Sequence, residues 1–472
     1  MTKAHFGLIG LGVMGENLVL NAERSGFSSV VFNRTLAKTE EFLAGRGAGK
    51  QIIGSTSLED FVAKLEKPRR ILMMVKAGQP IDDLITALSP LLEEGDLLID
   101  GGNSLYTDTE RRVNELESKS FGYIGMGVSG GAKGALEGPS MMPGGTRAAY
   151  DAIEPLVRKM AAQVSDGPCV TYIGPGGAGH FVKTVHNGIE YGIEQILAEA
   201  YDLLKRSAGL DGTAIADVFG QWNQLEELSS YLVEITEVCL REKDPEDGGD
   251  LVEKIVDAAG QKGTGLWTVV SALEMGISVP TIYAALNARV VSSQRPERLA
   301  AEPLFPPPAF VPVSLGDPAE GAPALRDACI LAAITSYAEG MALLVEASKL
   351  HDYQLDLAAI AQIWKGGCII RARLLQRIQD AYVTNPQLPS LLVDPWFAEQ
   401  IRLRLPGLRQ VVAGAAAAGI PVPCLRSALD AIDSYRSGRL PQNLVQAMRD
   451  AFGAHTYQRT DRPGSFHTDW PV

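Results

Sequence analysis

The sequence is poor in the residue that cross-links a chain. Five cysteines occur among its 472 residues, far apart, in an odd number and without the paired spacing of a metal site. Sparse cysteines of this kind favour a reducing setting, so we expect a cytoplasmic protein without a disulfide framework. The five are Cys169, Cys239, Cys329, Cys368 and Cys424.

Excess positive charge and long apolar runs are missing as well. The net charge of -13 argues against general binding to nucleic acid or to an anionic membrane surface, although a few placed cations can still form a local anion pocket. We find no apolar run of about 20 residues that would span a bilayer. The apolar run at the N-terminus is interrupted by four glycines, unlike a signal peptide.

What the sequence does contain is a globular composition, 46% hydrophobic and 21% charged, at a length that predicts two or three domains. Up to residue 174, short apolar runs alternate with helix-like segments, which is the pattern of a doubly wound domain with a parallel sheet. After residue 179, helical periodicity dominates. We predict an α/β domain over residues 1–178, an all-helical domain over 179–440 and a tail over 441–472. The apolar runs are 6–9, 30–32, 71–75, 97–99 and 170–173.

The helical part contains an internal repeat. Its segments 210–216, 275–280 and 196–200 recur after shifts of 145, 143 and 147 residues. Three matches in one order at nearly one offset indicate a tandem duplication of about 145 residues. The proline-rich stretch 302–323 is then the expected connector between the two copies.

A glycine-rich loop follows the first predicted strand and leads into a helix-like segment. Its glycines are spaced as GxGxxG, which permits a tight turn and the close approach of a pyrophosphate to the helix N-terminus. We therefore predict a Rossmann-like dinucleotide site, with a plain glycine-rich turn as the alternative. The loop residues are Gly10, Leu11, Gly12, Val13, Met14 and Gly15.

The end of the second predicted strand indicates which dinucleotide binds. An NAD site typically carries an acidic residue about 20 residues beyond the loop, whereas an NADP site has an arginine for the 2′-phosphate. Here the strand ends in Asn33, Arg34 and Thr35, with no acid among them. The sequence predicts NADP, with Arg34 as the ligand of its 2′-phosphate.

A polar stripe follows the predicted domain boundary. At about 100° per residue, Lys183, His186, Asn187 and Glu190 fall on one side of a helix, beside an apolar stripe. Such charges usually form a solvated helix face, and His186 and Asn187 could merely bond a neighbouring helix. A shift of 147 places the four at positions 330, 333, 334 and 337, which are apolar or aromatic, so the second copy lacks the stripe. This contrast favours chemistry over packing.

Nine segments in one order make the chain resemble the 6-phosphogluconate dehydrogenase family over nearly its full length. The resemblance implies NADP-dependent oxidation and decarboxylation of 6-phosphogluconate to ribulose 5-phosphate and carbon dioxide, a step of the pentose phosphate pathway. The segments are GLGVMG (10–15), FNRT (32–35), MMVKAG (73–78), DGGNS (100–104), GVSGG (127–131), KTVHNGIEYG (183–192), QKGTG (261–265), WKGGCIIR (364–371) and RDAFGAHTY (449–457).

The resemblance also assigns roles to residues. It makes Lys183 the base and Glu190 the acid, with no metal required, and His186 and Asn187 orienting groups. Cofactor contacts are implied for the loop 10–15, for Asn33, Arg34 and Thr35, and for Val75, Lys76, Ala77 and Asn103. Substrate contacts are implied for Asn103, Ser129, Gly130, Gly131, Lys183, His186, Asn187, Glu190, Tyr191, Lys262, Thr264, Arg289, Arg449 and His455.

The tail has two readings. By composition alone, residues from about 440 onward resemble a disordered terminus. The resemblance implies instead a homodimer in which the tail carries Arg449 and His455 into the partner's phosphate site.

Two other functions stay open at this stage. One is a simple β-hydroxyacid dehydrogenase that does not decarboxylate, and the other is a non-catalytic NADP-sensing protein. The first would need neither Glu190 nor the phosphate cations, and the intact pair Lys183 and Glu190 speaks against the second.

Overall fold

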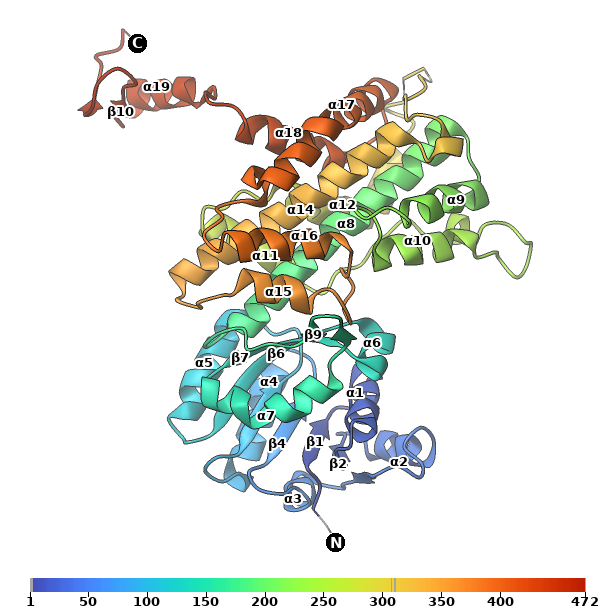
Figure 1. Ribbon diagram of the computed structural model, residues 1–472, viewed down its shortest axis with the longest axis vertical. Helices are drawn as coiled ribbons and strands as arrows, with labels where there is room; N and C mark the ends of the chain where they lie inside the picture. Colours follow the sequence, from blue (N-terminus) through green and yellow to red (C-terminus); the bar gives the residue numbers. More distant parts are fainter. Residues whose placement is uncertain (1–2, 307, 310, 472) are drawn as a thin grey trace.

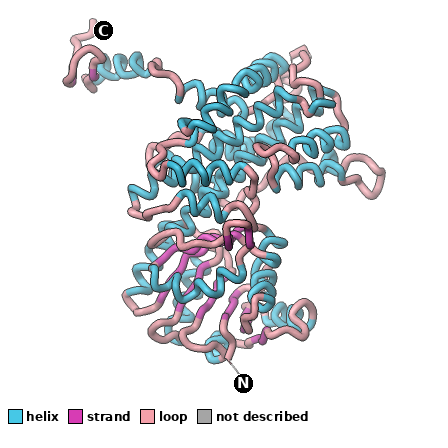
Figure 2. The backbone as a smooth tube through the Cα atoms, in the orientation of Figure 1, coloured by secondary structure: helices cyan, strands magenta, loops and turns pink. Residues whose placement is uncertain are grey.

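A seven-stranded sheet forms the core of the N-terminal part of the chain (Figures 1 and 2). The computed structural model describes residues 3–306, 308–309 and 311–471. The strand order is β3-β2-β1-β4-β5-β6-β7, and every neighbouring pair is parallel except β6 and β7. The strands are β1 (Phe6–Ile9), β2 (Ser29–Phe32), β3 (Ile52–Gly54), β4 (Arg70–Met73), β5 (Leu97–Asp100), β6 (Gly122–Ser129) and β7 (Ser140–Gly145).

Both faces of this sheet are buried, which confirms the doubly wound architecture. Leu8 belongs to one apolar cluster and its neighbour Ile9 to another, because successive side chains of a strand point to opposite faces. Helices pack on both faces and contribute to both clusters, together with the other strands. The helices are α1 (Val13–Arg24), α2 (Leu36–Ala44), α3 (Leu58–Ala63), α4 (Gln79–Leu88), the 3-10 turn η1 (Ser89–Leu91), α5 (Tyr106–Glu117), α6 (Gly131–Glu137) and α7 (Arg147–Met160).

The edge of the sheet differs from the prediction. The expected strand over 170–173 is wrong: this segment runs beside β7 and makes only isolated bridges, at Val170 and Gly174. Pro143 lies between the two bridges on β7 and has no amide hydrogen with which to continue a ladder. The proline and glycines of β7 are uncommon inside strands, and for this reason the sequence did not predict this antiparallel strand. A two-stranded hairpin, β8 (Gln163–Val164) and β9 (Gly167–Pro168), precedes the segment.

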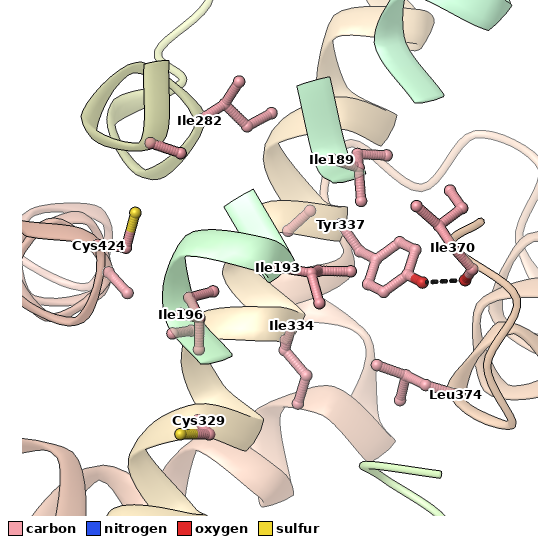
Figure 3. Close-up of a cluster of buried hydrophobic side chains, with 14 of the residues drawn as sticks. Ile189, Ile193, Ile196, Ile282, Cys329, Ile334, Tyr337, Ile370, Leu374 and Cys424 are labelled. Atoms are coloured by element: carbon pink, nitrogen blue, oxygen red, sulfur yellow. Dashed lines mark hydrogen bonds between the residues drawn. The ribbon is translucent and has the colours of Figure 1, made fainter. Parts of the chain in front are cut away.

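The second part of the chain is helical and is built around two long helices, α8 (Ala178–Ala208) and α14 (Pro323–Leu350). In Figure 3, Ile189, Ile193 and Ile196 of α8 lie against Ile334 and Tyr337 of α14. The other elements are α9 (Gly212–Trp222), α10 (Tyr231–Arg241), η2 (Leu251–Lys254), α11 (Thr264–Glu274), α12 (Pro280–Ser293), α13 (Arg295–Ala301), η3 (Pro318–Glu320), α15 (Leu357–Ile363), α16 (Leu374–Thr384), η4 (Leu391–Val393), α17 (Pro395–Ala418) and α18 (Pro423–Tyr435).

Helix α14 corrects our expectation that no apolar run was long enough to span a bilayer. By length and composition alone it would qualify as a membrane-spanning helix. In the structure, however, 89% of its most apolar window is buried inside the protein. Its hydrophobicity therefore reflects a central position in the helical bundle, where every side of a helix meets other helices.

Two buried carboxylates reveal how the repeated halves interlock. Glu199 on α8 accepts hydrogen bonds from the amides of Cys424 and Leu425 at the start of α18, and Glu339 on α14 accepts from Thr281 and Ile282 at the start of α12. Each half thus caps a helix of the other half.

The same pairs refine the offset of the repeat. The capped helices start 143 residues apart, which is the shift that the internal repeat gave for them. The two carboxylates are 140 residues apart, whereas the repeat gave a shift of 147 for the segment of Glu199. Seven residues are two helical turns, so an apolar pattern aligns nearly as well at either shift. At a shift of 140 the polar stripe maps to positions 323, 326, 327 and 330, and the second copy still lacks its lysine and glutamate. In the expected connector 302–323, positions 307 and 310 lie outside the described residues.

The tail is folded, so the reading of these residues as a disordered terminus is wrong. Helix α19 (Gln442–Gly453) and a hairpin of β10 (Tyr457–Gln458) and β11 (Ser465–Phe466) project away from the helical bundle (Figure 1). The fully buried carboxylate of Asp450 organises them. It accepts hydrogen bonds from His467 Nδ1 (3.0 Å), Trp470 Nε1 (2.8 Å) and the amides of Thr456 (2.9 Å) and Thr468 (3.1 Å). Several apolar side chains of α19 stay exposed, namely Leu444, Val445, Met448 and Phe452.

Candidate active site

The glycine-rich loop has the backbone that a dinucleotide site requires. Gly10 adopts a left-handed φ of 104°, and a side chain there would collide with the carbonyl of Met74. A side chain at Gly15 would collide with the carbonyl of Gly10, so the first turn of α1 closes tightly onto the loop. A side chain at Gly12, the N-cap of α1, would meet no atom of the described residues within 4 Å, so the space beside the amide end of the helix is open, as pyrophosphate binding needs. The residues present fit a dinucleotide.

The end of β2 supports this loop directly. Asn33 Oδ1 accepts a hydrogen bond from the amide of Leu11 (3.1 Å), and Asn33 Nδ2 donates to the carbonyl of Thr35 (3.1 Å). Arg34 and Thr35 are exposed beside it. Asn33 thus links the end of β2 to the glycine-rich loop, and Arg34 next to it is exposed to solvent.

Other predicted cofactor contacts lie at the carboxyl ends of the next strands. Val75, Lys76 and Ala77 follow β4, and Asn103 follows β5. Lys76 and Asn103 are exposed. The loop of Asn103 is held by Asp100, which accepts hydrogen bonds from the amide of Gly102 and from Ser104 Oγ. All these segments lie at the carboxyl ends of the parallel strands, where ligands of doubly wound domains bind.

Helix α8 starts against the backbone of this sheet. A side chain added at Gly179 would lie less than 3.0 Å from the carbonyl oxygens of Gly125 on β6 and Met142 on β7. Lys183 follows one turn further along α8. A side chain added at Gly127 of β6 would collide with the stem of this lysine. Glycines at these positions therefore let the helix lie directly on the strands and make room for the lysine.

The predicted polar stripe forms one cluster, in which Lys183, His186 and Asn187 are buried and the Glu190 side chain is 20% exposed. Lys183 Nζ lies 3.5 Å from His186 Nδ1, and Glu190 Oε2 lies 3.6 Å from the same ring nitrogen. His186 Nδ1 also lies 3.1 Å from Asn187 Oδ1, and its Nε2 lies 3.2 Å from Ser129 Oγ. A neutral imidazole satisfies both of these contacts by donating from Nδ1 and accepting at Nε2.

Burial shifts the proton affinities of this cluster in useful directions. Lys183 is only 5% exposed, and burial lowers the pKa of its ammonium group against the opposing charge of Glu190. Burial likewise raises the pKa of Glu190, against the charges of Lys183 and Arg289. For His186, burial and then the charge of Lys183 hold the pKa well below its ordinary value. Relative to ordinary side chains, burial thus shifts Lys183 toward the neutral amine, Glu190 toward the protonated acid and His186 toward the neutral imidazole.

Two of the recognised segments, GVSGG and WKGGCIIR, meet at the end of β6. Ser129 Oγ accepts a hydrogen bond from the amide of Ile369 (3.4 Å). Gly130 has a φ of 121°, and a side chain there would strike the carbonyl of Gly367. The amides and the hydroxyl around Ser129, Gly130 and Gly131 therefore sit at a junction between both parts of the chain. Backbone amides and a hydroxyl at such a junction are groups that can bind an anion.

A second polar group adjoins the stripe on its far side. Asn187 Nδ2 donates to Thr264 Oγ1 (2.9 Å), which is buried at the start of α11. The guanidinium carbon of Arg289 lies 3.5 Å from the centroid of the Tyr191 ring. Lys262 is exposed in the loop before α11. The structure thus brings Tyr191, Thr264 and Arg289 beside the stripe.

Arg449 and His455 are not part of this group within one chain. Both lie on the projecting tail, where Arg449 donates to Gln446 and the His455 ring contacts Phe452. Both are exposed.

Sequence reasoning missed three neighbours of the site. Trp364 packs its ring edge-on against His186, with centroids 5.6 Å apart. The buried thiol of Cys368 donates to the Trp364 carbonyl, and burial raises its pKa to about 12. Glu194 pairs with Arg289. Glu194 follows Glu190 by four residues, and this helical spacing was the feature of the sequence that could have placed it beside the site.

Two family models together match almost the whole chain. The one described as the NAD binding domain of 6-phosphogluconate dehydrogenase matches residues 5–174, and the one described as the C-terminal domain of 6-phosphogluconate dehydrogenase matches residues 179–470.

Full-length relatives of the chain are 6-phosphogluconate dehydrogenases as well. The chain is 59% identical to the decarboxylating 6-phosphogluconate dehydrogenase of Synechococcus elongatus, with all of both chains covered. It is 49% identical to the NADP(+)-dependent, decarboxylating 6-phosphogluconate dehydrogenase of Bacillus subtilis, again over all of both chains. Among solved structures, the 6-phosphogluconate dehydrogenase of Plasmodium falciparum matches with a TM-score of 0.94 and 43% identity, covering 99% of this chain and 100% of that one. That protein was described in its apo form, with its cofactor NADP+ and with its substrate 6-phosphogluconate.

Proposed function

The chain belongs to the 6-phosphogluconate dehydrogenase family, and from that premise we propose how its residues carry out the reaction of its relatives. The enzyme oxidises 6-phosphogluconate with NADP and decarboxylates it, giving ribulose 5-phosphate and carbon dioxide. The observation that supports the assignment of roles is a buried lysine with a lowered pKa that shares one face of α8 with Glu190.

The cofactor occupies the loop at residues 10–15 in this proposal. Gly10 and Gly15 admit the pyrophosphate, Arg34 pairs with the 2′-phosphate, and residues 75–77 and Asn103 border the nicotinamide side. Bound NADP supplies the hydride acceptor for C3 of the substrate. The chain itself supplies orientation and proton transfer.

Lys183 acts twice. As a neutral amine, its Nζ accepts the proton of the C3 hydroxyl while hydride leaves C3, giving a 3-keto acid. As an ammonium group, it then donates a hydrogen bond to the C3 carbonyl oxygen and stabilises the negative charge that develops there as carbon dioxide leaves. Its lowered pKa makes the neutral amine more accessible than in an ordinary lysine.

Glu190 completes the reaction. Loss of carbon dioxide leaves an enediolate, and a proton added at C1 of the product converts it to the ketone. Glu190 lies two turns beyond Lys183 on the same face, and its raised pKa keeps a carboxylic acid available to donate that proton. His186 and Asn187 hold the two groups and the substrate hydroxyls in place.

The two ends of the substrate bind apart from the reacting carbons. Its carboxylate meets the amides and the hydroxyl of Ser129, Gly130 and Gly131. Its phosphate meets a set of donors and cations suited to a dianion. That set comprises Tyr191, Lys262, Thr264 and Arg289, with Arg449 and His455 supplied by the tail of a partner subunit.

The assembly and the cellular setting belong to the same proposal. Residues 441–472 reach the partner of a homodimer, since the exposed apolar side chains of α19 need a surface to cover them. All five cysteines are unpaired, which suits a reducing cytoplasm. Residues 1–178 hold the cofactor, and residues 179–440, built from two repeats, supply the catalytic helix and the dimer interface.

The test is NADP reduction with 6-phosphogluconate while released carbon dioxide is trapped. Equal yields of NADPH and carbon dioxide are expected, whereas a simple β-hydroxyacid dehydrogenase would yield NADPH alone and a sensing protein neither. Lys183→Met should abolish both products. Lys205→Met, on the same helix but with a side chain that is 41% exposed and paired with Glu253, should leave them unchanged.

The pH profile separates the acid from the base. Activity should fall at low pH as Lys183 gains a proton and at high pH as Glu190 loses one. At saturating substrate, Glu190→Gln should be slow and its kcat should lose the alkaline decline, because the proton donor to C1 is gone. A decline that persists in this variant would remove Glu190 from the proposed role.

A further inference from the structure

Arg289 is held on three sides by its own chain. Its Nη2 pairs with Glu194 on α8, its Nη1 donates to the carbonyl of Gly260 (2.8 Å), and its guanidinium lies over the Tyr191 ring. Its side chain is 18% exposed, so one part still faces solvent. The guanidinium is therefore preset in position before any anion arrives.

Glu194 belongs to a small acidic group around this arginine. It lies one turn beyond Glu190 on α8, and Arg289 reaches it from α12. Among the described residues, Glu190 and Arg289 are the charged groups that bear on its carboxylate. Partial burial and the charge of Glu190 raise the pKa of Glu194 to about 7. The single guanidinium thus faces two carboxyl groups.

A substrate phosphate at Arg289 would add two more negative charges beside Glu194. Like charges at such short range repel strongly when the site is shielded from water. The repulsion disappears if Glu194 takes up one proton from solvent, which its 37% exposure allows. Its carboxylate then becomes a neutral acid, and no other group needs to change.

We propose that Glu194 is an internal counter-anion of Arg289, which competes with the substrate phosphate and becomes protonated when that phosphate binds. This inference rests on the proposed function, because it takes Arg289 as a phosphate ligand. Glu194 is here a positioning residue, since it acts through Arg289. Glu194 would also help the enzyme to select phosphorylated sugar acids, because a sugar acid without a phosphate cannot displace Glu194 from Arg289.

The experiment uses sulfate as the probe, because sulfate stays dianionic from pH 6 to pH 9. Its binding to the full-length enzyme is measured by calorimetry in two buffers of different ionisation enthalpy, which counts the protons taken up. For the natural protein, linkage to one group with a pKa of about 7 predicts that the dissociation constant rises about fivefold between pH 7 and pH 8.

Glu194→Gln should bind sulfate more tightly than the natural protein at pH 8, with little change at pH 6 and little proton uptake. The Michaelis constant for 6-phosphogluconate should follow the same pattern. Asp202→Asn is the matched control, since Asp202 is a similarly exposed carboxylate on the same helix, paired with Arg206. It should behave as the natural protein does.

Two outcomes would overturn the inference. Either Glu194→Gln keeps the pH dependence of the natural protein, or it weakens sulfate binding at every pH, which would make Glu194 an aid to the phosphate site. Arg289→Met distinguishes failure of the underlying assignment: an unchanged Michaelis constant in that variant would remove Arg289 from the phosphate site, and the inference would fall with it.

Discussion

The contact between α8 and the sheet makes Gly179→Ala a demanding test of the site. The added methyl group would lie less than 3.0 Å from two carbonyl oxygens and from the amide nitrogen of Gly144. All three are backbone atoms of the sheet, so no side chain can rotate away. The helix itself must move.

The size of the effect follows from that geometry. Ordinary contact begins at 3.4 Å, so the start of α8 has to move by about 1 Å, and Lys183 follows one turn later. A misplacement of about 1 Å at reacting groups costs roughly 100-fold in rate. Overpacking should also lower the free energy of unfolding by about 1–3 kcal/mol.

The assay compares turnover, NADP affinity and thermal unfolding in Gly179→Ala and in Gly438→Ala. A methyl group added at Gly438 would meet no atom of the described residues within 4 Å, so that variant should match the natural protein in all three. For Gly179→Ala we expect a large loss of turnover with NADP affinity retained, because the loop at residues 10–15 lies at a different strand. Near-normal turnover would refute the argument that Lys183 is positioned by backbone contact.

Two further predictions concern the cofactor and the tail. Arg34→Asp should weaken NADP binding about 10- to 150-fold, the equivalent of losing a charge-assisted contact of about 1.5–3 kcal/mol, and should leave NAD binding equal or better. Fluorescence titration with both cofactors measures it, and unchanged NADP affinity would disprove the assignment. Mixing an Arg449→Ala chain with a Lys183→Met chain should restore activity, because one site of the mixed dimer then carries neither defect. If subunits exchange and no activity returns, the tail serves its own chain.

Much of the α/β part could be predicted because its signals are local. The apolar runs at β1, β2, β4 and β5 and the spacing of Gly10, Gly12 and Gly15 are each contained in a few residues. The edge at β7 could not be predicted, since its pairing depends on β6 and its proline and glycines argue against a strand.

The polar stripe could be located from sequence, but its electrostatics could not. Helical spacing alone placed Lys183 and Glu190 on one face. Their pKa shifts depend on burial under segments more than 50 residues away, such as those carrying Ser129 and Trp364. The pairing of Glu194 with Arg289 likewise joins residues 95 positions apart, which no local pattern reports.

The Asp450 cluster has a consequence for how two chains would meet. Burial raises the pKa of Asp450, but the hydrogen bonds from His467 and Trp470 and from backbone amides outweigh it and leave the pKa well below its usual range. Asp450 therefore stays ionised at the pH of a cell, and the hydrogen bonds that it accepts hold the tail together within a single chain. If the tail binds a partner as proposed, two surfaces that are already folded associate. Binding then avoids the loss of conformational entropy that a disordered tail would suffer on becoming ordered. Its rate should then depend on chain concentration and carry no separate folding phase.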